Sequence, residues 1–208
     1  LFERATQDES AQLWTSLEDV VPLLAEAAPD PFLRALSQST SGTKPLAGKL
    51  FQDVDQHWNA GSPHTGFLWA LEGLAWSEQY MGYAAEVLAQ LAEIDTGGRL
   101  SNRPSASLEA IFRPWYPQSA ASMATRVQTL DVLIRRHREV SWKLLIDLIP
   151  KPSVVAFQSH RPQFRAWGGP SEPSVPRPEV IEMVEAVVDR ILMLATEEPS
   201  RWVSVLPK

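Results

Sequence analysis

The feature that most constrains this chain is the spacing of apolar residues between positions 65 and 150. Within residues 80–94, apolar side chains stand at positions 80, 83, 84, 87, 88, 91 and 94. Intervals of three and four place them on one face of an α-helix. Glu86, Gln90 and Glu93 fall on the opposite face, so we predict an amphipathic helix that buries one side.

The ends of this helix are marked by local signals. Ser77 is a candidate N-cap, and Glu78 would lie in the first turn, where the helix dipole favours an acid. Asp95-Thr96-Gly97-Gly98 ends the helix and supplies a glycine for the left-handed position. A second apolar stripe precedes Ser77 and consists of Phe67, Leu68, Leu71, Leu74 and Ala75. Because one or two residues separate the stripes, we predict an antiparallel helical hairpin.

A second pair of stripes follows the same plan. One helix carries Val127, Leu130, Leu133 and Ile134, and the next carries Val140, Leu144, Leu145, Leu148 and Ile149. The basic run Arg135-Arg136-His137-Arg138 lies at the junction, where cations suit the negative end of the preceding helix. The run could instead bind nucleic acid, although the acidic chain favours a solvated helix end. The four stripes predict an all-α fold of stacked antiparallel helical hairpins, an irregular α-solenoid-like array.

The composition is that of an ordinary globular protein. Of the 208 residues, 44% are hydrophobic and 21% charged, and the net charge of −6 argues against a nucleic-acid surface. The absence of cysteine excludes disulfides, zinc ribbons and thiol catalysis. No apolar run reaches the roughly 18–20 residues that span a bilayer, and a secretory signal pattern is missing. We expect one cytoplasmic helical domain over residues 1–208 without a membrane partner, as a fragment of a longer protein because the chain starts at Leu1.

The first 63 residues are more broken in pattern. Thr6-Gln7-Asp8-Glu9 fits a capping box with Thr6 as N-cap. Leu13, Leu17, Val20, Val21 and Leu24 follow at helical spacing, and Pro22 predicts a kink or a restart among them. Asp30 is expected to cap a helix that has Pro31 at its first position. Residues 37–42 are predicted to form a polar loop, and residues 46–54 a short helix.

Two segments outside the hairpins carry aromatic and basic residues. In the first, Arg103-Pro104-Ser105 introduces a short helix with Leu108, Ile111 and Phe112. Arg113-Pro114-Trp115-Tyr116-Pro117-Gln118 follows, and its prolines exclude a helix. We predict a rigid connector whose rings cover the hairpin ends, with an aromatic binding shelf as the alternative.

The second segment, residues 151–178, is rich in proline and is predicted to be irregular. Phe157, Phe164 and Trp167 are expected to clamp it onto the helices; aromatics among arginines could alternatively stack on single-stranded nucleic acid. Arg177-Pro178-Glu179 then opens a long helix that ends at Pro199. Its apolar residues cover more than one stripe, which predicts that this last helix is largely buried.

Eight tryptophans are many for a chain of this length. Three fall within helical stripes and are expected in the core: Trp69, Trp76 and Trp142. The other five lie near breaks or ends and are expected to be half exposed: Trp14, Trp58, Trp115, Trp167 and Trp202.

No catalytic motif is present. The chain lacks a phosphate loop, a Gly-x-Gly-x-x-Gly fingerprint and a Gly-x-Ser-x-Gly elbow. The local cluster Asp53-x-Asp55-x-His57 resembles a metal site, but on a helix only positions 53 and 57 share a face. We therefore predict neither a cofactor nor a metal. The alternative is an enzyme whose site is assembled from distant residues such as Glu72, His64 and Arg103.

Several segments of the sequence resemble a known class of protein. They are Leu71-Glu72-Gly73-Leu74-Ala75-Trp76-Ser77, residues 87–99, Arg113-Pro114-Trp115-Tyr116-Pro117-Gln118-Ser119 and Trp142-Lys143-Leu144-Leu145. Together they resemble the helical region of very large bacterial multidomain proteins, in which it follows a STAND-type NTPase module or another effector domain, many of them linked to anti-phage defence. The resemblance implies a helical scaffold and transfers no catalytic residues.

We therefore expect a non-enzymatic scaffold or recognition segment, with an enzyme or a nucleic-acid-binding helical module as alternatives. Its partner is expected to be a protein or a neighbouring domain of the same polypeptide. Arginine and tryptophan are frequent at binding hot spots. Six such residues, in two irregular segments, are predicted to border one partner-binding surface: Arg103, Arg113, Trp115, Arg161, Arg165 and Trp167.

Overall fold

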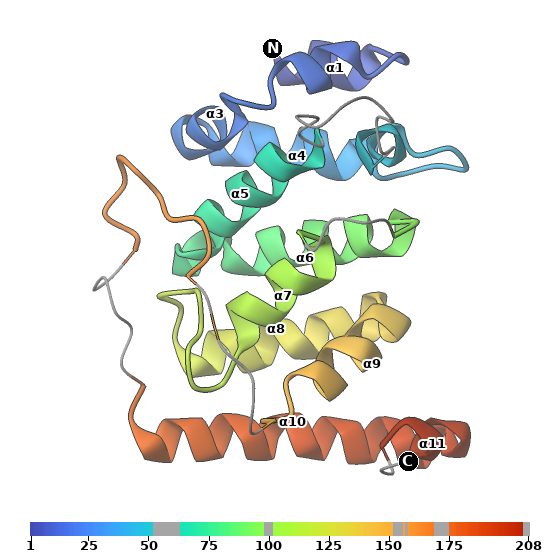
Figure 1. The fold of residues 1–208 in the computed structure, drawn as a ribbon, viewed down its shortest axis with the longest axis vertical. Helices are drawn as coiled ribbons and strands as arrows, with labels where there is room; N and C mark the ends of the chain where they lie inside the picture. Colours follow the sequence, from blue (N-terminus) through green and yellow to red (C-terminus); the bar gives the residue numbers. More distant parts are fainter. Residues whose placement is uncertain (52–62, 98–101, 152–155, 157, 169–174, 206–208) are drawn as a thin grey trace.

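The computed structural model describes residues 1–51, 63–97, 102–151, 156, 158–168 and 175–205. Within these residues every regular element is an α-helix or a short 3₁₀-helix, which confirms the prediction of an all-α fold. The helices follow one another in layers, and the two termini lie near opposite ends of the long axis (Figure 1). The stacked-hairpin solenoid remains a prediction.

The N-terminal layers consist of α1 (Phe2–Gln7), α2 (Gln12–Ser16), α3 (Val21–Ala27) and α4 (Pro29–Ser39). The predicted capping box is wrong, because Thr6 lies inside α1 and its hydroxyl donates to the Phe2 carbonyl at 3.0 Å. Asp8 supports the start of the next helix, α2, because its carboxylate accepts the backbone N–H of Leu13 at 2.8 Å. The predicted restart at Pro22 is found, because α2 ends at Ser16 and a new helix, α3, begins at Val21 with Pro22 in its first turn.

Two further boundaries in this region differ from the prediction. Helix α4 begins with Pro29, so Ala28 rather than Asp30 precedes it. It continues to Ser39, into the predicted polar loop. The 3₁₀-helix η1 covers Leu46–Phe51. The rest of that predicted helix, the cluster Asp53-x-Asp55-x-His57 and Trp58 lie outside the described residues.

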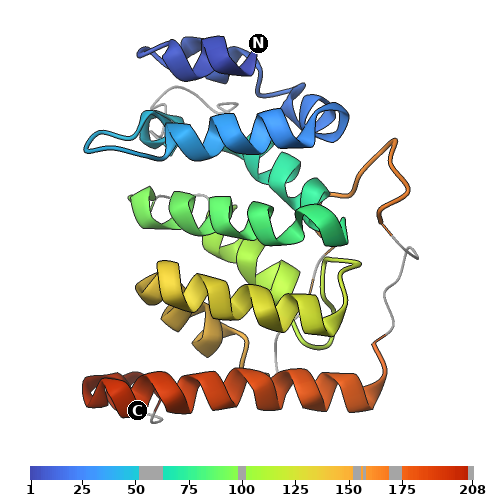
Figure 2. The same cartoon turned by 180° about the vertical axis from the view of Figure 1, so that it is seen from behind.

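The central helices are α5 (His64–Ala75), α6 (Glu78–Ile94), α7 (Pro104–Phe112), α8 (Met123–Arg136) and α9 (Arg138–Asp147). Ser77 occupies the N-cap position of α6 as predicted, although its side chain makes no capping bond. Gly97 has a φ of +77°, in the left-handed region that favours glycine. Helix α6 contacts α4 and α5 on one side and α7, α8 and α9 on the other (Figure 2).

The central position of α6 explains why it buries more than the predicted stripe. Met81, Ala85 and Ala89 are buried in addition to Ala84, Val87, Leu88 and Leu91. The alanines let neighbouring helices approach from both sides, because a methyl group takes up little room. A continuous apolar core runs from Phe2 in α1 to Ala195 near the C-terminal end.

The C-terminal end is formed by α10 (Arg177–Glu197), η2 (Pro199–Arg201) and α11 (Trp202–Val205). Ion pairs join α10 to α8: Arg126 to Glu179 and Arg190 to Asp131, both at 2.8 Å. The prediction that α10 is largely buried is wrong. One face packs on α8 and α9, while Ile181, Val188, Leu192 and Met193 stay between 39% and 49% exposed.

Two tryptophans, Trp69 and Trp14, have the opposite exposure from the one predicted. Trp76 and Trp142 are buried as expected, but Trp69 is 44% exposed although it lies in the middle of α5. Trp14 is fully buried, where it stacks on Phe2 and meets the edge of Phe67. None of the described helices is long and apolar enough to cross a bilayer.

Candidate functional site

Residues 158–168, here called the strap, cross the outer side of α3 and α5 without forming a helix. In Figure 1 the strap is part of the orange segment beside the helical layers. The prediction of an irregular segment is confirmed for the described part of residues 151–176, whereas residues 177 and 178 already belong to α10. Polar side chains from three separate parts of the chain hold the strap.

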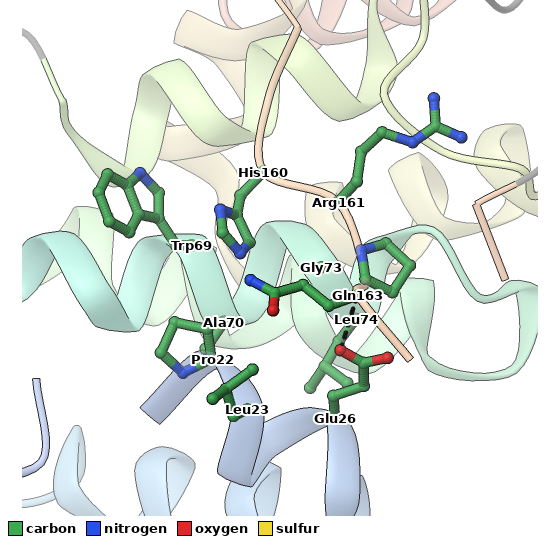
Figure 3. Close-up of a pocket in the computed structure, with 11 residues that line it drawn as sticks. Pro22, Leu23, Glu26, Trp69, Ala70, Gly73, Leu74, His160, Arg161 and Gln163 are labelled. Atoms are coloured by element: carbon green, nitrogen blue, oxygen red, sulfur yellow. Dashed lines mark hydrogen bonds between the residues drawn. The ribbon is translucent and has the colours of Figure 1, made fainter. Parts of the chain in front are cut away.

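The first anchor is Glu26 of α3, which is only 6% exposed. Its carboxylate accepts three consecutive backbone N–H groups: Gln163 at 2.8 Å, Phe164 at 2.5 Å, and Arg165. Successive N–H groups form a concave site for an anion, and bonds to a charged acceptor are stronger than neutral ones. Figure 3 shows the Glu26 side chain directed at Gln163. One carboxylate thus fixes the backbone of the strap over three residues.

The second anchor is Glu72 of α5, which is 7% exposed. It accepts the Ser107 hydroxyl at 2.7 Å and the backbone N–H of His160 at 2.9 Å. Burial raises the pKa of Glu72, and the two donors partly offset that rise. The indole N–H of Trp76 donates to the carbonyl of His160 at 3.1 Å, so both backbone groups of His160 are held.

The third anchor lies in the connector that follows α7. Gln118 is fully buried, and its side-chain oxygen accepts the backbone N–H of Ser159 at 3.0 Å. Its own backbone N–H donates to Ala110 in α7 at 2.9 Å. The connector at residues 113–118 is non-helical, as predicted, and Gln118 at its end supports one end of the strap.

Rings and guanidinium groups complete the attachment. The Arg161 guanidinium lies 4.0 Å from the centre of the Trp76 ring, within cation–π range, and also donates to the Gly168 carbonyl. Trp167 packs on Tyr80, with ring centres 5.5 Å apart. Trp167 therefore clamps the strap onto α6, as predicted for it.

Phe164 behaves in the opposite way from the prediction. It is 79% exposed and so does not clamp the strap, while Phe157 lies outside the described residues. Arg165, next to it, is exposed and lies 5.6 Å from the Trp167 ring. Two apolar side chains of the shallow depression beside the strap, which Gln163 also lines, are exposed as well: Leu23 at 38% and Trp69 at 44%. Trp69 stacks almost parallel on His160 at 5.4 Å.

The depression between the strap, α3 and α5 is too small for a ligand. Its volume is about 10 Å³, which is room for one water molecule, whereas small-molecule pockets measure roughly 300–1,000 Å³. Figure 3 shows Gln163 and His160 lying across it, with Leu23 and Pro22 on the side of α3. The arrangement offers an outward contact surface instead of a cavity.

The six residues predicted to border one surface do not share one environment. Arg161, Arg165 and Trp167 come together in the strap. Arg103 and Arg113 are 8% and 7% exposed, so they present little surface to a partner. Arg103 pairs with Asp95 and Arg113 with Glu109, each at 3.0 Å, and the two arginines occupy the N-cap and C-cap positions of α7. Trp115 is half-buried and lies 6.0 Å from the Arg113 guanidinium.

The residues of the alternative enzyme site are brought together only in part. His64 is 1% exposed, stacks on Phe51, and lies 2.9 Å from the Asn102 carbonyl. Burial lowers its pKa, and Arg103 lies close enough for its charge to help lower it, whereas Glu72 is bound to Ser107 and His160. Glu72 stands two turns away along α5, about 12 Å at 1.5 Å per residue. No group of three His, Asp or Glu side chains that could hold a metal occurs in the part of the chain that the structure describes.

Three residues of the basic run at the junction of α8 and α9 are paired with acids from other helices. Arg136 meets Glu86 at 2.5 Å, His137 meets Glu93 at 3.0 Å, and Arg138 meets Glu197 at 2.5 Å. These contacts join α8 and α9 to α6 and α10. They favour the interpretation of the run as a helix junction.

The anchors of the strap could not be found from sequence spacing. Glu26 and the three amides it binds are 137 to 139 positions apart, and Glu72 lies 88 positions from His160. The one available signal was an acid within the apolar stripe of each helix. No protein-family model, curated protein or solved structure matches the chain, so the geometry of the strap carries the functional proposal.

Proposed function

We propose that the chain is a non-enzymatic helical scaffold that recognises a protein partner through the outer side of the strap. The contact surface consists of Leu23, Trp69, Phe164 and Arg165. The observation that carries this proposal is the 79% exposure of Phe164 on a backbone segment that one buried carboxylate fixes. An exposed ring on a fixed backbone can bind with little loss of conformational entropy.

The chemistry of the surface favours a protein over a small molecule or a nucleic acid. Aromatic residues and arginine are enriched at the centres of protein interfaces. The shallow depression leaves no room for a small substrate, and the net charge of −6 opposes a polyanion. Rigid scaffolds commonly present binding residues on loops of this kind.

The parent context of the scaffold is part of the same proposal. The resemblance of residues 68–150 to the helical region of large bacterial proteins supports the proposal of a cytoplasmic multidomain parent protein with a role in anti-phage defence. In such a protein the partner is another protein or a neighbouring domain of the same polypeptide. An open reading frame much longer than 208 codons, with a phosphate-loop motif upstream, is the expected gene context.

Site-specific photocrosslinking in the source cell tests the contact surface. Benzoylphenylalanine replaces Phe164 in the parent protein, and the exposed side chain leaves the fold undisturbed. The expected result is one protein adduct of defined mass that mass spectrometry identifies, either with another protein or within the parent polypeptide. Adding Arg165→Ala should reduce the adduct several-fold without changing Tm.

The matched control places the same photoreactive residue at Val203 of α11, which is 72% exposed but far from the strap in sequence. It should not yield the same adduct. Equal labelling from both positions would show unspecific capture, and an adduct removed by nuclease would support the nucleic-acid alternative. Either result contradicts the proposed function.

A further inference from the structure

Helix α10 carries an apolar stripe on the face turned away from the other helices. Ile181, Val188 and Leu192 are 49%, 39% and 44% exposed. Val188 and Leu192 follow Ile181 by seven and eleven positions, which places all three on one side of the helix. The opposite side of α10 packs Met183, Val187, Ile191 and Leu194 into the core. The helix is therefore apolar on two sides, and its neighbours cover one of them.

The place of α10 in the array indicates the shape of an occupant. Helix α6 is covered on both sides by other helices, and α8 and α9 lie between α6 and α10. Figure 2 shows α10 lying across the end of the layers with its outer side open. Each inner layer is covered by a helix, so a further helix fits the outer face of α10 in the same manner.

The charges beside the stripe indicate the chemistry of that helix. Glu182, Glu185 and Asp189 are exposed along the flank of the stripe. Arg190, the cation in the middle of the helix, is engaged with Asp131 of α8 on the inner side. The flank therefore presents three carboxylates over two turns, and electrostatic complementarity calls for cations on the partner.

We propose that the outer face of α10 is a docking site for an amphipathic helix of a partner protein that carries lysine or arginine beside its apolar stripe. Apolar residues of the partner would cover Ile181, Val188 and Leu192, and its cations would lie against Glu185 and Asp189. A second copy of the chain fits less well, since two antiparallel α10 helices would bring their acidic flanks side by side. The site is separate from the strap.

Two synthetic peptides test the chemistry directly. Both have 21 residues with leucine at spacings of three and four, and they differ only in having lysine or glutamate beside the leucines. Fluorescence anisotropy with the complete chain should show saturable binding of the lysine peptide, and at least tenfold weaker binding of the glutamate peptide. The affinity for the lysine peptide should fall as salt screens the charges.

Variants of α10 separate this docking site from unspecific attraction to an acidic protein. Val188→Asp with Leu192→Asp adds negative charge but removes the apolar stripe, and should weaken the lysine peptide at least tenfold. Glu185→Lys with Asp189→Lys should reverse the preference between the peptides. Phe164→Ser should change neither affinity. Because these side chains are exposed, Tm is expected to stay near that of the wild type.

Three outcomes would overturn the docking site. Equal affinity for both peptides would show that charge does not select the partner. Unchanged binding by the variant with Val188→Asp and Leu192→Asp would show that the apolar stripe does not take part in binding. If analytical ultracentrifugation shows a dimer of the wild type that Val188→Asp converts to a monomer, the outer face of α10 binds a second copy of the chain.

Discussion

The strap and helix α6 both lie against α5, but different forces hold them. Helix α6 is held by apolar burial on both sides, whereas the strap is held by Glu26, Glu72 and Gln118 through directional hydrogen bonds. Apolar contacts are numerous and tolerant of small shifts, while one carboxylate that serves three amides concentrates its effect in a few atoms. The core should therefore determine global stability, and the anchors should determine the local order of the contact surface.

The largest expected effect is in the core. Leu88→Ala, at a fully buried position of α6, should lower the free energy of unfolding by about 2–5 kcal/mol, because it removes apolar contacts and leaves a cavity. Urea denaturation followed by circular dichroism measures the change. A loss below about 1 kcal/mol would show that α6 is not the centre of a tightly packed core.

A close backbone contact gives the next effect. At Gly66 of α5, an added Cβ would lie 2.1 Å from the Glu18 carbonyl oxygen. Gly66→Ala should therefore cost about 1–3 kcal/mol through overpacking, although alanine is the better helix former. Gly82→Ala is a matched control, since the Cβ there meets the Thr129 hydroxyl at an ordinary 3.6 Å. Equal stability of the two variants would contradict the close approach of α5 to residue 18.

The layered helices were predictable because their signals are local. Intervals of three and four residues defined α5, α6, α8 and α9, and the predicted left-handed glycine is found at Gly97. The exposure of Trp69 was not predictable, since it depends on where the strap and α3 stop covering α5. An apolar residue on a helix does not reveal which neighbour covers it, and the same limit explains the wrong prediction for α10.

The strap shows a second limit of sequence reasoning. Its proline content predicted irregular structure, but its anchors come from residues that are distant in the chain and carry no shared motif. Arg103 and Arg113 were predicted to border a binding surface because arginine is frequent at binding hot spots. Asp95 and Glu109 pair with them instead and allow their burial.

Glu26→Gln should separate the local order of the strap from the stability of the core. One neutral amide oxygen cannot accept three N–H groups, so the strap should open while the helices stay packed. The expected global loss is about 1–2 kcal/mol, because water can reach the freed amides. Hydrogen exchange should accelerate at Gln163, Phe164 and Arg165, and remain slow in α6. Uniform acceleration throughout the chain would mean that the strap and the helices unfold as one unit.

The smallest expected effect concerns the pH dependence of stability. The pKa of Glu72 is raised by burial in the folded chain, so the folded state holds this proton more tightly than the unfolded state does. The resulting stability is fully present below the unfolded value near 4.5, and is lost as pH rises through the folded pKa. Glu72→Gln removes this titration and keeps a side-chain oxygen that accepts from Ser107 or His160. The wild type minus variant difference in unfolding free energy should therefore fall as pH rises from 4.5 toward neutrality. Urea denaturation at several pH values measures it, and a difference that is constant or grows with pH would show that the Glu72 carboxylate is not held in a desolvated site beneath the strap.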